Sequence, residues 1–74
     1  MSTVRDDKLL KKIGLNVRTL RIDKNWSQQQ LANNAEIELS QVSRIELGKS
    51  DASISTLSAI AKALKVKLAD LFDF

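Results

Sequence analysis

The chain contains no proline and only two glycines among its 74 residues. Its apolar side chains recur at intervals of three and four residues, the spacing that places them on one face of an α-helix. No segment shows the strict alternation typical of a half-buried strand. The sequence therefore predicts an all-α fold, and a chain this short forms one domain, covering 1–74.

Helix boundaries are predicted from these apolar stripes and from the residues that flank them. Ser27 and Gln30 form a capping-box pattern, and Trp26 stands just before it, where a large apolar group packs onto the helix that follows. Ser53 is a second N-cap, and Gly48 supplies a left-handed residue after a helix end. The predicted helices span 7–24, 28–34, 39–47, 54–64 and 68–72.

The residue types that the chain lacks exclude several classes of function. It has no cysteine and no histidine, which rules out disulfides, zinc fingers and Ser-His or Cys-His catalysis. We therefore predict no catalytic residues, no metal site and no cofactor. No apolar stretch approaches the roughly 20 residues of a membrane helix, and the segment 1–7 lacks the apolar core of a secretory signal, so a cytoplasmic location is expected.

Charge is distributed unevenly along the chain. The net charge is +3 and the isoelectric point is near 9.5, which favours a polyanionic partner. Residues 1–24 carry seven basic and three acidic side chains, whereas 36–52 carry two basic and four acidic ones. If the middle segment meets an anion, its acids will weaken binding.

The segment 28–47 carries the strongest functional signal. Two short helices are joined there by a short turn, and the second helix has polar residues on one face and aliphatic residues on the other. This is the pattern of a helix-turn-helix, in which the second helix enters the DNA major groove. The sequence thus predicts a recognition helix at about 39–47.

An ordered set of residues across 10–72 resembles the phage repressor and Cro (XRE-like) family of helix-turn-helix regulators. The resemblance implies a compact five-helix repressor-like domain that binds double-stranded DNA. The matching residues are Val17, Leu20, Arg21, Ser27, Gln28, Leu31, Ala32, Val42, Ser43, Arg44, Ile45, Glu46, Gly48, Lys49, Leu57, Ile60, Ala61, Ala63, Leu64 and Leu71.

The same resemblance assigns roles to individual residues. It places a phosphate at Gln28, where the N-terminus of a helix also attracts anions on physical grounds. It makes Arg21 and Glu46 a structural ion pair between the first and third helices. For Arg44 a pairing with a nearby acid remains an alternative to a base contact. The expected DNA-binding residues are Ser27, Gln28, Leu39, Ser40, Gln41, Ser43, Arg44 and Lys49.

Two acids depart from the family pattern, which favours a glycine in the turn and a serine or threonine cap on the third helix. Glu36 is expected to adopt the turn conformation at some cost, and Glu38 to replace a better cap. Both acids stand close to the expected path of the phosphates. We therefore expect modest nonspecific affinity for DNA.

One recognition helix covers only a few base pairs, so useful affinity requires a two-fold dimer on a palindromic operator. Apolar residues near the chain end and after the third helix are the candidates for such an interface, although Phe72 can instead cap the core of the monomer. The interface candidates are Leu47, Leu68, Phe72 and Phe74.

Two functions of different kinds fit these observations. The first is a dimeric transcriptional regulator that lacks a small-molecule effector, a format that restriction-modification controllers and small phage repressors share. The second is a protein-interaction module, such as an antitoxin or anti-repressor adaptor with weak or no DNA binding, which Glu36 and Glu38 support. An enzyme is disfavoured by the missing residue types.

Overall fold

The computed structural model describes residues 5–74, so residues 1–4 of the predicted domain and of the segment 1–7 lie outside the described part. The described residues form four α-helices and a final 3-10 helix, which confirms the all-α prediction. The elements are α1 (Asp7–Asp23), α2 (Gln28–Ala35), α3 (Leu39–Glu46), α4 (Ile54–Leu64) and η1 (Leu68–Phe72).

Three approximate boundaries differ from the predicted ones by one residue, and the short last helix is of the 3-10 type. α1 ends at Asp23 because Lys24 closes a tight turn, its N–H donating to the carbonyl oxygens of Arg21 and Ile22. α2 extends to Ala35, and α3 ends at Glu46 with Leu47 as its C-cap. The predicted fifth helix is a five-residue 3-10 helix, a form common in segments this short.

Side-chain caps begin three of the helices. Asp6 accepts a hydrogen bond from the N–H of Leu9 at 3.0 Å, and Ser53 accepts one from the N–H of Thr56 at 3.1 Å. Ser27 and Gln30 form the predicted capping box, with bonds of 3.1 and 2.7 Å between each side chain and the other's N–H. These caps fix where α1, α2 and α4 begin.

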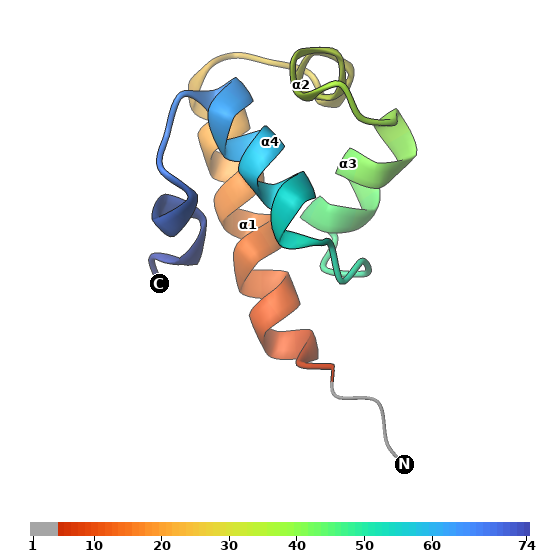
Figure 1. Ribbon diagram of the computed structural model, residues 1–74, viewed down its shortest axis with the longest axis vertical. Coiled ribbons are helices and arrows are strands. Elements are labelled where there is room, and N and C mark those ends of the chain that lie inside the picture. Colours follow the sequence, from red (N-terminus) through yellow and green to blue (C-terminus); the bar gives the residue numbers. More distant parts are fainter. Residues whose placement is uncertain (1–4) are drawn as a thin grey trace.

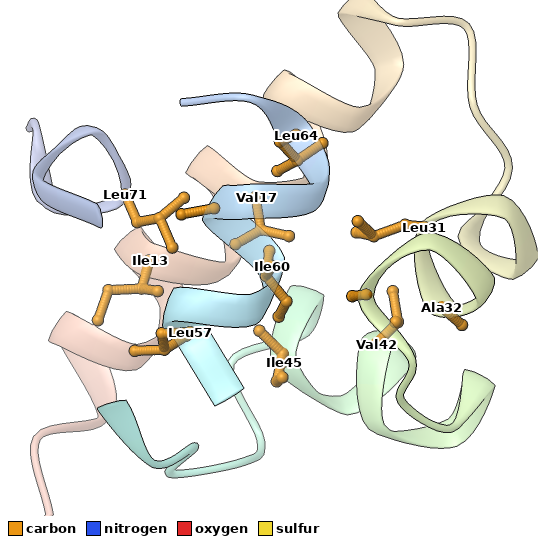
Figure 2. Close-up of a cluster of buried hydrophobic side chains, with 12 residues drawn as sticks. Ile13, Val17, Leu31, Ala32, Val42, Ile45, Leu57, Ile60, Leu64 and Leu71 are labelled. Atoms are coloured by element: carbon orange, nitrogen blue, oxygen red, sulfur yellow. The ribbon is translucent and has the colours of Figure 1, made fainter. Parts of the chain in front are cut away.

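The helices surround one core (Figures 1 and 2). α1 runs along the long axis of the molecule, with α3 against it on one side and η1 on the other, and α4 packs on α1, α2 and η1. Trp26 is half-buried and packs against this core, as predicted, with the Lys24 ammonium 5.4 Å from its ring centre. The buried hydrophobic residues are Ile13, Val17, Leu31, Ala32, Ala35, Val42, Ile45, Leu57, Ile60, Ala61, Leu64 and Leu71.

Within residues 5–74 we find no helix with both the length and the apolar character needed to cross a bilayer.

Candidate nucleic-acid interface

The turn between α2 and α3 consists of residues 36–38. Glu36 ends α2 in the left-handed conformation, with φ 58° and ψ 44°, as the sequence predicted. That region disfavours a side chain with a Cβ atom by about 1–2 kcal/mol. The N–H of Ile37 donates to the carbonyl oxygen of Ala32 at 3.0 Å, and the Ile37 side chain packs against the core. The turn thereby brings α3 onto both α1 and α2.

Two glycines allow α3 to lie unusually close to α1. A Cβ atom on Gly14 would clash with the carbonyl oxygen of Ile45 and would lie 2.7 Å from that of Glu46. Gly48 has φ 71°, and a Cβ atom there would lie 2.8 Å from the Cα atom of Lys11. The backbone of α1 therefore meets the carboxyl end of α3 with no room for a side chain at either glycine.

An ion pair joins the same two helices. The Nε and Nη2 atoms of Arg21 donate to the two carboxylate oxygens of Glu46 at 2.7 and 2.9 Å, and the two side chains are only 12% and 3% exposed. The Nη1 atom of Arg21 donates to the carbonyl oxygen of Trp26 at 2.7 Å. The bonds and charge of Glu46 raise the pKa of Arg21, although burial acts in the opposite direction. This bidentate pair fixes α3 to α1 and to the start of α2.

The opposite side of α3 faces outward. Leu39, Ser40 and Arg44 are exposed, and Gln41 and Ser43 are half-buried. Arg44 forms no ion pair within residues 5–74, so its guanidinium is not taken up by the nearby acids. Ser40, Gln41 and Arg44 line an open depression together with Glu38 and Ser50, which we call the α3 hollow.

A second depression lies where the N-terminus of α2 meets α3. It contains Gln28 and Ser43 from the predicted set, and Arg18, which the sequence analysis did not include. The Nε2 atom of Gln28 donates to Glu46 at 3.0 Å, which leaves its second amide hydrogen free. We call this depression the α2 hollow; Arg21, Glu46 and Leu47 complete its lining.

Comparison with known proteins identifies this arrangement. The helix-turn-helix family model matches residues 17–71. The chain belongs to this helix-turn-helix family. It is 39% identical over 62 residues to the control protein C.BamHI of Bacillus amyloliquefaciens, a match that covers 82% of this chain and 76% of that protein.

A solved structure and a second relative show the same similarity. The restriction-modification controller protein C.AhdI of Aeromonas hydrophila superposes with a TM-score of 0.84 at 33% identity, over 85% of this chain and 96% of that one. A competence pilus inhibition repressor of Acinetobacter baylyi is 37% identical over 60 residues, covering 81% of this chain and 54% of that protein. The helix-turn-helix protein is thus a sequence-specific DNA-binding transcriptional regulator rather than an enzyme.

The remaining polar candidates of the helix-turn-helix protein lie at the two ends of the motif. Lys49 is exposed directly after Gly48, and its carbonyl oxygen accepts a bond from Arg5 at 3.0 Å. The Ser27 hydroxyl is occupied by the capping box. Arg18 could have been found from the sequence, because it lies three residues before Arg21 on the same helix.

The four dimer candidates differ in exposure. Leu47 and Phe74 are 57% and 58% exposed, and Phe72 is 36% exposed. Leu68, which the sequence analysis named as an interface candidate, is half-buried and packs against the core, because η1 lies against α1 and α4. Ile54, at 63%, is the most exposed large hydrophobic residue within residues 5–74 and was missed by the sequence analysis.

An apolar depression of about 140 Å³ lies beside Ile54. Phe72 forms part of its wall, so this side chain contributes to the depression and is also partly exposed. We call it the apolar hollow; it is lined by Leu9, Leu10, Ile13, Ile45, Ser50, Asp51, Ala52, Ile54, Leu57 and Phe72.

No group of three acidic side chains within residues 5–74 is arranged to hold a metal ion.

Proposed function

We propose that the protein binds a palindromic operator as a two-fold dimer, with α3 of each copy in the major groove of one half-site. The observation that supports this most directly is the outward face of α3, where Leu39, Ser40 and Arg44 are exposed and Arg44 forms no ion pair within residues 5–74. In such complexes the half-sites lie about 34 Å apart along the DNA.

Base recognition is assigned to the α3 hollow and its edge. Arginine makes a bidentate contact with guanine O6 and N7, and glutamine makes one with adenine N6 and N7, so Arg44 and Gln41 are the principal reading residues. The Ser40 hydroxyl accepts or donates, and Leu39, 42% exposed, can contact only a thymine methyl group.

Phosphate contacts are assigned to both ends of the motif. Gln28 presents its remaining amide hydrogen at the N-terminus of α2, where the helix dipole also attracts an anion. Arg18 and Ser43 line the same α2 hollow and are suited to the same phosphate. Ser27 stands at the edge of this site, and Lys49 suits a phosphate beyond the other end of α3.

The dimer contact is assigned to Ile54 and the apolar hollow. A protruding side chain beside a depression on one surface suits a two-fold interface, in which each copy inserts Ile54 into the other's hollow. Phe72 extends this contact. Leu47 and Phe74 stay candidates, although the Lys12 ammonium lies 5.2 Å from the Phe74 ring centre and already covers one face of it.

Selection of bound duplexes from a random pool tests the whole proposal. We expect a palindromic consensus and binding that weakens steeply with salt, because bound phosphates release counterions. Arg44→Ala should relax one base position in each half-site and weaken binding by about 1–3 kcal/mol. Binding that is absent at every salt concentration would instead favour the interaction module.

Sedimentation of two matched variants tests the interface. Ile54→Glu should give a monomer with affinity for the palindrome reduced about tenfold or more, because a buried carboxylate opposes the contact. Leu15→Glu places the same charge on the outer face of α1 at a similar exposure, 58%, and should leave the dimer intact. If Ile54→Glu still sediments as a dimer, the proposed interface is wrong. The proposal that the protein binds DNA would not be affected by that result.

A further inference from the structure

Glu38 is an exposed carboxylate at the N-terminus of the recognition helix, and its side chain has no bonding partner within residues 5–74. It is the N-cap of α3, yet its side chain makes no capping hydrogen bond. It forms no ion pair with any side chain in residues 5–74. Its oxygens are therefore available to a ligand of α3.

The surroundings of Glu38 differ from those of Glu36, two residues earlier. Glu38 lines the α3 hollow with Ser40, Gln41 and Arg44, the side chains assigned to base edges. Glu36 faces a different depression, which Lys62 and Lys65 of the α4 end also line. Only Glu38 shares a surface with the reading residues.

We propose that Glu38 is a specificity-determining residue that accepts a hydrogen bond from the N4 amino group of a cytosine. This inference rests on the proposed function, because it requires α3 to lie in the major groove. A carboxylate only accepts hydrogen bonds, so it is repelled by the O6 and N7 acceptors of guanine and the O4 acceptor of thymine. Adenine offers an amino group, but its N7 acceptor lies beside it. Cytosine alone presents an amino donor with no acceptor on the same base in the major groove.

The spacing along α3 relates this cytosine to the guanine assigned to Arg44. Six residues separate the two side chains, which corresponds to about 9 Å along a helix axis. Base pairs are stacked about 3.4 Å apart, so the two contacts lie about two to three base pairs from each other. We expect Glu38 to contribute discrimination between bases rather than affinity. The reason is that a wrong base leaves a desolvated carboxylate facing an acceptor.

Two charge-neutralising variants distinguish recognition of a base by Glu38 from general repulsion of the DNA phosphates by a negative charge. Selection from a random pool with the wild type, Glu38→Gln and Glu36→Gln compares the loss of one negative charge inside and outside the α3 hollow. In the wild type we expect a cytosine favoured about tenfold at one position of each half-site. In Glu38→Gln that preference should move to adenine, which glutamine reads. Glu36→Gln should bind every duplex more tightly with an unchanged consensus.

Other results would contradict the proposed role of Glu38. If Glu38→Gln, like Glu36→Gln, tightens binding to all duplexes by one factor and keeps the consensus, Glu38 only repels phosphates and the inference is wrong. Thermal melting of each variant checks that the fold is retained. If the wild type binds no duplex, the proposed function fails first and the role of Glu38 fails with it.

Discussion

The two ends of α3 are held in very different ways. At its carboxyl end Glu46 is bonded to Arg21 and Gln28, and Gly14 and Gly48 let the backbone of α1 approach to contact distance. At its amino end the cap residue Glu38 makes no capping bond, and the turn passes through Glu36 in a left-handed conformation. The carboxyl end is therefore held by side-chain bonds and close backbone contact, whereas the amino end is held through Ile37, whose N–H donates to Ala32 and whose side chain packs against the core.

The difference follows from what each end has to do. A recognition helix must be presented at a set angle, and the carboxyl end achieves this through contacts with the protein itself. In the proposed complex the amino end enters the groove, where polar groups already bonded to the protein could not read bases. We therefore expect substitutions at the carboxyl end to act mainly on stability, and those at the amino end mainly on binding.

Loss of the buried ion pair should give the largest effect. Arg21→Ala and Glu46→Ala should each lower the free energy of unfolding by about 3–5 kcal/mol, because each leaves a buried charge without its partner. Urea or thermal unfolding measures this. Arg18→Ala, an exposed arginine on the same helix, is the control and should have little effect. Unchanged melting in both ion-pair variants would reject the structural role of the pair.

A methyl group at Gly14 should give the next largest effect. Alanine is favoured over glycine in a helix by about 1 kcal/mol, so propensity alone predicts stabilisation. The clash with two backbone carbonyls of α3 should reverse the sign and destabilise the protein by about 1–3 kcal/mol. Ser58→Ala, at an exposed site of α4, should be close to neutral. A Gly14→Ala protein that melts higher than the wild type would show that α3 can move away from α1.

The contrast also marks what the sequence could predict. The helices, the Ser27 capping box and the conformation of Glu36 follow from local spacing and turn chemistry, which a sequence carries directly. The close approach at Gly14 depends on a backbone 31 residues away, which local spacing does not reveal. The apolar hollow beside Ile54 likewise needs four elements, α1, α3, α4 and η1, packed together, so periodicity alone could not reveal it.

Relief of the backbone strain at Glu36 should change the free energy of unfolding by a smaller amount, and here the change is a gain. Glu36→Gly should stabilise the protein by about 0.5–1 kcal/mol, since glycine adopts the left-handed region freely but loses more entropy on folding. Lys65→Gly is a matched control, because Lys65 has φ 59° at the end of α4 and should gain a similar amount. Only Glu36→Gly should also tighten DNA binding at low salt, because it removes a negative charge near the phosphates. Equal DNA affinity in the two variants would contradict that account of Glu36.

The smallest effect on stability should come from giving α3 the cap it lacks. In Glu38→Ser the hydroxyl can accept the N–H of Ser40, because the N–H of Gln41 already donates to the backbone carbonyl oxygen of residue 38 at 3.0 Å. We expect a gain of about 0.5 kcal/mol in unfolding free energy. The same variant should lose the cytosine preference, because the carboxylate that reads the amino group is gone. Glu38→Ala removes the carboxylate without adding a cap, so it should lose the preference with no gain in stability. If Glu38→Ser becomes more stable and keeps its base preference, the carboxylate of Glu38 takes no part in base recognition. The missing cap would then affect only the stability of the protein, and the contrast between the two ends of α3 would describe stability alone.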